Sequence, residues 1–169
     1  MTYEEAINYL EAANVFGIQL GLGRIQNLLE RLGNPQNKYQ TIHVTGTNGK
    51  GSVTAMIASA LTEAGFKTGR YTSPHLEDYT ERIHIDHHDI SRDDFAAAVA
   101  VVKDAVTAMV AEGGEGPTEF ELITAAASGI LPVSASTMPS SKSAWGDSSI
   151  RPTSLSRPYR SLLTWPWIT

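Results

Sequence analysis

The stretch that decides the fold is QTIHVTGTNGKGSVTAMIASALTEAG, residues 40–65. Its first six residues alternate and are rich in β-branched side chains, which predicts a strand over 40–45. A glycine-rich turn, GTNGKGS, follows directly, and the apolar positions after it are typical of a helix that ends at Gly65. The sequence therefore predicts a strand, a tight turn and a helix in immediate succession.

A glycine-rich turn in this position favours phosphate binding. The backbone can curl around phosphate oxygens, and the first N–H groups of the helix carry a partial positive charge. Lys50 adds a charge for the outer phosphates, and a hydroxyl just inside the helix can reach a bridging Mg²⁺. The generic phosphate-loop spacing would place a glycine at Val44 and a hydroxyl at Gly51, whereas this chain has Gly46 and Ser52. A glycine turn without phosphate is the alternative.

The flanking sequence predicts further helices and strands. Capping-box spacings precede three of the helices, at Thr2 and Glu5, at Ser91 and Asp94, and at Thr118 and Glu121. We expect helices over 3–14, 24–32 and 95–112 and from 118 into LITAAA, and strands over 67–72 and 82–86. This alternation predicts an α/β fold, with a mostly parallel sheet flanked by helices.

Composition and charge exclude several classes of protein. The chain has 169 residues, 41% of them hydrophobic, which fits one globular domain and excludes a collagen-like chain. It has no cysteine, so a disulfide scaffold is excluded, and its net charge of -5 argues against general nucleic-acid binding. We found no run of about 18 apolar residues and no basic leader, so we expect no membrane span and a cytoplasmic location.

The character of the chain changes near Ala127. Residues 1–127 carry 17 of the 18 acidic residues and 9 of the 13 basic residues, a net charge of -8. Residues 128–169 have a net charge of +3 and hold 11 serines, 5 of the 8 prolines and all three tryptophans. We therefore divide the chain into 1–127, with the α/β pattern, and 128–169, a Ser/Pro-rich tail that we expect to be poorly ordered and without strands.

The string HVTGTNGKGS resembles the phosphate loop of the Mur ligase superfamily. GIQLGLGR before it, YTSPHL and ERI after it, and TEFE at 118–121 together resemble the folylpolyglutamate synthase and dihydrofolate synthase family over residues 1–127. The resemblance implies an incomplete Mur-ligase-like central ATP-binding domain. It also implies a ligase that uses ATP and Mg²⁺ to join L-glutamate to dihydropteroate or a reduced folate such as tetrahydrofolate, through an acyl phosphate.

The resemblance also implies site residues, with Lys50 as the main catalytic charge. Those implied for ATP are Gly46, Thr47, Asn48, Gly49, Lys50, Gly51 and Ser52, and those implied for the metal are Ser73 and Ser52. Those implied for the pteroate or folate are Leu20, Gly21, Leu22, Gly23, Pro74, His75, Thr118, Glu119, Phe120 and Glu121. The implied partners are small molecules only, with no nucleic acid and no membrane, and the intact enzyme is expected to be a monomer.

Several of these residues have simpler interpretations. Ser73 before Pro74 can simply start a turn, and Thr118 with Glu121 is explained as a capping box, which is compatible with ligand contact. His87, His88 and Asp89 could suggest a metal, but adjacent strand residues point to opposite faces, so a polar hairpin tip is favoured.

The tail is interpreted as the product of a shifted reading frame. After ITAAA the family resemblance implies an apolar strand with a metal-binding Glu in an EVGLGG motif and then a strand that ends in an Asp-His pair, and the printed tail has neither. Residues 129–144 can be back-translated so that the shifted frame reads WYFASERVDYAVIEVG, and later residues permit FDSTNV and TNMAMDH. The hypothesis is a one-nucleotide slip near Ala127 that leaves this chain with little activity, and a natural basic Ser/Pro linker is the alternative.

Two other function classes stay open at this point. One is another Mur-type ligase acting on a UDP-linked precursor, although only 45 residues precede Gly46, fewer than the roughly 50 of a small separate domain. The other is a fragment that binds nucleotide without catalysis.

Overall fold

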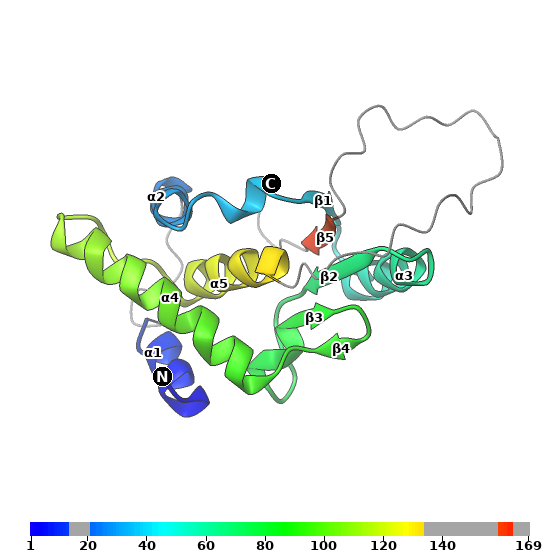
Figure 1. Ribbon diagram of the computed structural model, residues 1–169, viewed down its shortest axis with the longest axis horizontal. Coiled ribbons are helices and arrows are strands. Elements are labelled where there is room, and N and C mark those ends of the chain that lie inside the picture. The colour runs from blue at the N-terminus through cyan, green and yellow to red at the C-terminus, as the bar shows by residue number, and fades with distance from the viewer. Residues whose placement is uncertain (14–20, 134–158, 164–169) are drawn as a thin grey trace.

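The computed structural model describes residues 1–13, 21–133 and 159–163, which form helices on both sides of one sheet (Figure 1). The α-helices are α1 (Tyr3–Ala12), α2 (Gly23–Arg31), α3 (Lys50–Glu63), α4 (Arg92–Ala111) and α5 (Glu119–Val133). The strands are β1 (Gln40–His43), β2 (Lys67–Tyr71), β3 (Ile83–Ile85), β4 (His88–Asp89) and β5 (Tyr159–Leu163), and two short 3-10 helices are η2 (Pro35–Asn37) and η3 (Tyr79–Arg82). The predicted α/β fold class is confirmed.

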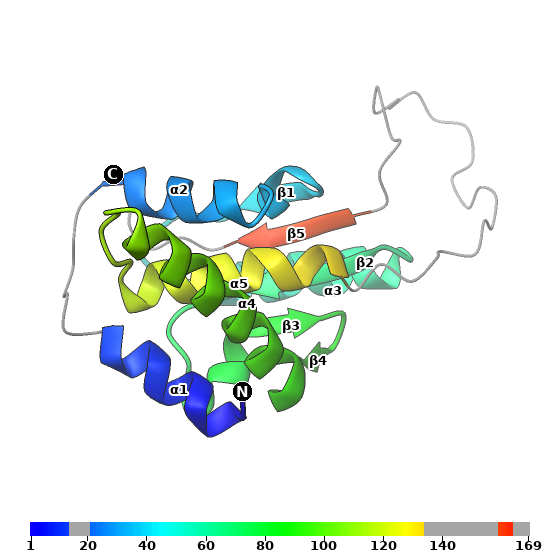
Figure 2. The same ribbon diagram turned by 60° about the vertical axis from the view of Figure 1, so that its left-hand side comes forward.

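The sheet has the strand order β1-β5-β2-β3-β4. β5 runs parallel to both β1 and β2 and lies between them (Figure 2), while β3 and β4 add an antiparallel edge next to β2. At the carboxyl end of β5, Leu163 is level with His43 of β1 and Tyr71 of β2. β1 and β2 therefore end at the same edge of the sheet, one strand apart.

The strand β5 lies in the tail, where the sequence predicts no strand. Backbone N–H and C=O groups form the sheet ladder whatever side chains they carry, so the position between β1 and β2 needs an extended segment more than a particular composition. The predicted absence of strands from the tail is wrong for Tyr159–Leu163. The rest of the division into 1–127 and 128–169 stays a prediction.

The core lies between α5 and the helices packed around it, and between α5 and the sheet. In Figure 1 the sheet stands between α5 on one side and α3 on the other. The largest fully buried apolar side chains come from six helices and strands, namely Leu10, Leu28, Tyr71, Ile83, Phe95, Val99, Met109, Leu122 and Ile123. Gly69 of β2 allows α5 to approach closely, because a Cβ there would lie 1.8 Å from Cδ2 of Leu131.

The predicted capping interactions at the starts of α1 and α4 are confirmed. Thr2 and Glu5 form a reciprocal capping box on α1, and Ser91 Oγ accepts the N–H of Asp94 at the start of α4. Several boundaries differ from the prediction. α3 begins at Lys50, inside the predicted turn GTNGKGS, because the glycine turn itself forms the entry to the helix. α4 begins at Arg92, three residues before the expected start, β1 ends at His43, two residues early, and α5 continues past Ala127 to Val133. Among the described residues no helix is long and apolar enough to cross a membrane.

The polar segment after β3 is a hairpin tip, as favoured above. Asp86 adopts a φ of 55° at the turn, and its carboxylate accepts the N–H of Thr68 at 2.8 Å. His84 Nδ1 lies 2.7 Å from Asp89 Oδ1 across the hairpin, and His87 Nε2 lies 3.4 Å from Glu63 Oε1. Within the described ranges no group of three His, Cys, Asp or Glu residues is arranged to hold a metal ion.

Asp78 joins the first turns of three helices. Its carboxylate accepts hydrogen bonds from the Tyr3 hydroxyl, from the N–H and hydroxyl of Thr80, and from Nη2 of Arg92 at 2.7 Å. Burial alone would raise the pKa of the Asp78 carboxyl, but these hydrogen bonds outweigh it and hold the pKa well below its usual range. Burial, together with the bond to Asp78, raises the pKa of Tyr3 to about 12.

The lowered pKa predicts how stability depends on pH. Because the Asp78 carboxyl has a lower pKa in the folded state than its unfolded value of about 3.9, its contribution is complete above that value and is lost as the pH falls below it. Asp78→Asn should therefore be less stable than the wild type near neutral pH, and the difference should shrink between about pH 5 and about pH 2. Urea unfolding of both proteins across this range measures it, and a difference that is constant with pH contradicts the assignment.

A proline in β5 tests whether the tail strand belongs to the sheet. Ser161 is level with Thr41 on one side and Gly69 on the other, so Ser161→Pro removes a ladder N–H inside the sheet and should cost about 1–3 kcal/mol of unfolding free energy. The matched control is Ser161→Ala, which keeps the backbone N–H. Equal urea midpoints for the two variants would show that β5 is not paired in solution.

Candidate functional site

The glycine-rich turn lies between β1 and α3, as predicted. Gly46 has a φ of 148° and Gly49, at the N-cap of α3, has a φ of 76°, a region that favours glycine. No side chain caps Gly49, and the first N–H groups of a helix have no partner within it. The turn therefore presents backbone donors and the positive end of the helix dipole to the same space, an arrangement suited to an anion.

The Lys50 ammonium is held over this turn. Its Nζ donates to the carbonyl oxygens of Gly46 at 2.5 Å and Thr47 at 3.0 Å. One helical turn further on, the buried Thr54 donates its hydroxyl to the Lys50 carbonyl at 2.7 Å, which fixes the start of α3. A localised positive charge thus stands beside the free N–H groups of the helix.

A cavity of about 230 Å³ joins the turn to the loop after β2. Its walls are made by the five residues Thr47, Asn48, Gly49, Lys50 and Gly51, and by Thr72 and Ser73. The peptide bond between Ser73 and Pro74 is cis. Because β1 and β2 end at the same edge of the sheet, the predicted phosphate loop and the predicted metal-binding serine meet here.

The first turn of α5 forms a second polar cluster. Glu121 Oε2 accepts the N–H of Thr118 at 2.8 Å and its hydroxyl at 3.0 Å, so the expected capping interaction is present. The same oxygen accepts Nε of Arg24 at 3.2 Å, and both side chains of this ion pair are nearly buried. Arg24 is the last residue of GIQLGLGR, so this ion pair joins that segment to TEFE, two of the segments that carry the family resemblance.

Glu119 connects α5 to the loop after β2. Its Oε1 accepts the Tyr79 hydroxyl at 2.9 Å and lies 3.9 Å from Nη2 of Arg82. Burial, and then the bond to Glu119, raise the pKa of Tyr79 far above its usual range. Arg82 in turn donates its Nε–H to Nδ1 of His75 at 2.7 Å. Burial and the Arg82 charge lower the pKa of His75.

Within the described part of the chain, the remaining residues predicted for the site do not line the cavity formed by the turn and Ser73. Ser52 is exposed and does not line the cavity, while Pro74 is exposed and Phe120 is half-buried. Gly21 and Leu22 are exposed just before α2, and Gly23 begins that helix. Leu20 lies outside the described residues. These positions stay predictions for ligand contact.

Three interacting residues were not singled out from the sequence, namely Arg24, Tyr79 and Arg82. Arg24 and Tyr79 bind glutamates that lie 97 and 40 positions further along the chain, so local spacing in the sequence does not reveal these pairs. One signal was available, because Asp78 and Glu81 have capping-box spacing and do form that box on η3. That motif predicts an ordered turn next to YTSPHL.

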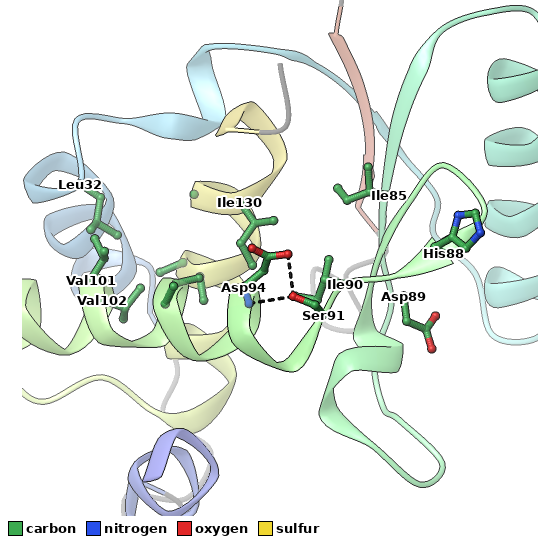
Figure 3. Close-up of a pocket in the computed structure, with 15 residues that line it drawn as sticks. Leu32, Ile85, His88, Asp89, Ile90, Ser91, Asp94, Val101, Val102 and Ile130 are labelled. Atoms are coloured by element: carbon green, nitrogen blue, oxygen red, sulfur yellow. Dashed lines mark hydrogen bonds between the residues drawn. The ribbon is translucent and has the colours of Figure 1, made fainter. Parts of the chain in front are cut away.

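A larger hollow of about 580 Å³ lies elsewhere, between α4, α5 and the β3–β4 hairpin (Figure 3). Figure 3 shows mainly apolar side chains around it and the hydrogen bond between Ser91 and Asp94 at the start of α4. None of the residues predicted for ATP, metal or folate is among its lining residues in the described part of the chain. Of the predicted site residues, Thr47 to Gly51 and Ser73 line the smaller cavity instead.

Comparisons with known proteins point to one family, although no family model matches the chain. This chain is 42% identical over 125 residues to the dihydrofolate synthase/folylpolyglutamate synthase of Bacillus subtilis, and the matched segment makes up 74% of this chain and 29% of the relative. It is 41% identical over 126 residues to the folylpolyglutamate synthase of Lacticaseibacillus casei, again with 74% and 29% covered. The chain therefore spans less than a third of the length of these relatives.

Solved structures agree with the sequence matches. The folylpolyglutamate synthetase from Lactobacillus casei superposes with a TM-score of 0.78 at 32% identity, over 97% of this chain and 36% of that one. The structure of E. coli FolC in complex with DHPP and ADP superposes with a TM-score of 0.74 at 26% identity, over 97% of this chain and 33% of that one. Together with the strand–turn–helix and its cavity, these matches show that the chain belongs to the folylpolyglutamate synthase/dihydrofolate synthase family, with its Mur ligase fold.

Proposed function

We propose that this chain is part of an ATP-dependent ligase that adds L-glutamate to dihydropteroate or to a reduced folate such as tetrahydrofolate. The observation that carries the proposal is the cavity in which the glycine-rich turn and Ser73 come together. The names of the relatives support it, as do the solved structures of relatives described as an FPGS-AMPPCP-folate complex and as FolC with DHPP and ADP.

In this proposal Gly46 to Ser52 hold the phosphates of ATP. The free N–H groups at the start of α3 would donate to phosphate oxygens, and Lys50 would exchange its two carbonyl partners for the outer phosphates. Electrostatic stabilisation of this kind suits a reaction in which negative charge moves between oxygens.

The residues at the cavity suit Mg²⁺. Magnesium prefers oxygen ligands and is often bound by few protein groups together with substrate phosphates. Ser73 and Thr72 line the cavity with hydroxyls, and the described residues offer no carboxylate and histidine cluster that would compete for the metal. We propose that Ser73 holds the ion, together with Ser52 of α3, which lies outside the cavity lining, and the ion would supply Lewis-acid neutralisation of the phosphate charge.

The pteroate or folate would bind on the α5 side of the cavity. Leu20 to Gly23, Pro74, His75 and Thr118 to Glu121 are proposed to line this site. The Arg24–Glu121 ion pair and the Tyr79–Glu119 hydrogen bond support the proposal, because they fix the first turn of α5 relative to α2 and to the loop after β2.

The proposed reaction has two steps. The substrate carboxylate attacks the γ-phosphorus of ATP, so that an acyl phosphate forms and ADP leaves. The amine of glutamate then attacks the acyl carbon, loses its proton and displaces phosphate. Neither step needs a covalent intermediate on the protein, so Lys50 and the helix N-terminus act by position and charge. All partners are small molecules, and we propose that the intact enzyme acts as a cytoplasmic monomer.

We further propose that residues 128–169 are an out-of-frame tail. Similarity to the two relatives above extends over 125 and 126 residues, about the length that precedes the change in composition near Ala127. The tail lacks the EVGLGG and Asp-His motifs that the resemblance implies, so we propose that this chain binds nucleotide but catalyses little glutamate transfer.

Nucleotide binding can be tested directly on this chain. Calorimetric titration with ATP and Mg²⁺ should show binding, and Lys50→Ala should weaken it by about tenfold or more, because a charge-assisted contact is worth about 1.5–3 kcal/mol. The matched control is Lys38→Ala, an exposed lysine remote from the turn. Equal weakening by both variants, or no binding by the wild type, argues against the proposed site.

The reading frame is tested by sequencing the gene across codon 127. We expect an open shifted frame that continues beyond the codon of Thr169 and encodes the missing motifs. The protein made from the restored frame should release ADP only when glutamate and either dihydropteroate or tetrahydrofolate are present, while the 169-residue chain should release little. A shifted frame full of stop codons would refute the out-of-frame origin of the tail.

A further inference from the structure

The loop formed by residues 72–78 connects the cavity to η3 and is held by little apolar packing. Pro74 and Glu77 are exposed, and the side chain of Leu76 is 93% exposed. Fixing a backbone costs conformational entropy that buried apolar area usually offsets. The ring of His75 packs against that of Tyr79, with 4.3 Å between the ring centres, but the loop otherwise buries little, so its order depends mainly on hydrogen bonds.

Glu81 supplies the first group of these bonds. Its Oε2 accepts the N–H of Leu76 at 2.8 Å, and its Oε1 accepts the N–H groups of Glu77 at 2.9 Å and Asp78 at 2.8 Å. One carboxylate thus binds three consecutive backbone donors. These bonds lower the pKa of the Glu81 carboxyl, as expected when hydrogen bonds favour the charged form.

Arg82 supplies the second group, at the other end of the loop. Its carbonyl oxygen accepts the N–H of Thr72 at 2.9 Å, and its Nε–H binds Nδ1 of His75 at 2.7 Å. The residue is only 8% exposed, and its guanidinium lies 5.1 Å from the centre of the Tyr79 ring. The cis bond between Ser73 and Pro74 lies between the two points at which Arg82 holds the loop.

We propose that Glu81 and Arg82 are positioning residues that hold the 72–78 loop, and with it Ser73, against the glycine-rich turn. Thr72 and His75, on either side of Ser73, are both hydrogen-bonded to Arg82, and these two contacts hold the backbone around Ser73. Arg82 also lies 3.9 Å from Glu119 of α5, so one guanidinium connects the proposed metal-binding loop to the proposed folate side. The role of Ser73 in this inference rests on the proposed function.

The first test measures the loop without any ligand. Amide hydrogen exchange on the full chain should be about tenfold or more faster for Leu76, Glu77 and Asp78 in Glu81→Ala than in the wild type, because each N–H loses its charged acceptor. The amides of α4 should be unchanged. Glu77→Ala is the matched control, since it removes an exposed acid from the same loop. Relative to the intrinsic rates of each sequence, it should leave the protection of these amides unchanged.

The second test separates positioning from general stability. ATP affinity is measured by calorimetry with and without Mg²⁺ for the wild type, Arg82→Met and Arg82→Lys. Arg82→Met should reduce the Mg²⁺-dependent gain in affinity by about tenfold, the lower end of the cost of losing a group that orients a metal ligand. Its affinity for ATP without Mg²⁺ should be unchanged, and Arg82→Lys should recover part of the gain. Arg31→Met, which breaks the ion pair of Arg31 with Glu112 between α2 and α4, is the control.

Two results would overturn the inference. One is unchanged exchange of the loop amides in Glu81→Ala, and the other is an equal loss of affinity with and without Mg²⁺ in a folded Arg82→Met. If Arg82→Met fails to fold, as loss of α4 protection would show, the Glu81→Ala exchange rates decide alone. A wild-type chain that binds no ATP would contradict the proposed function, and the exchange experiment would still decide whether Glu81 holds the loop.

Discussion

The spacing of β1 and β2 is the constraint on which the site depends. These two strands do not pair with each other, and β5 lies between them with both ladders made. Adjacent strands lie about 4.8 Å apart, so β5 holds the ends of β1 and β2 at about twice that distance. The glycine-rich turn leaves one of these ends and the Ser73 loop leaves the other. The cavity lined by the turn and by Ser73 lies where these two segments meet.

The gap between β1 and β2 must be filled by an extended backbone, and it requires much less of the side chains on that segment. Both neighbouring strands present N–H and C=O groups to it, and leaving them unpaired would be costly. Tyr159–Leu163 fill this gap as a strand although they lie in the Ser/Pro-rich tail, because pairing with β1 and β2 depends on their backbone groups.

The features that the sequence predicts well are local. Three capping motifs, the glycine turn and the hairpin tip depend on residues a few positions apart, and all are present. The features missed are long-range. The Tyr79–Glu119 bond spans 40 positions and the Arg24–Glu121 bond spans 97, and no periodicity encodes such partners. The position of β5 was missed because a strand in a Ser/Pro-rich segment is determined by its neighbours and not by its own composition.

The order of the strands along the chain has a consequence for synthesis. β2 ends at Tyr71 and the strand that pairs with it, β5, begins at Tyr159. A ribosome adds roughly 5–20 residues per second, so β1 and β2 are made several seconds before their shared partner leaves the exit tunnel. During that interval two strand edges that face each other have no strand between them, and unpaired edges promote association with other chains. The yield of folded protein should therefore depend on chaperones that cover nascent strands, more than its final stability alone would suggest.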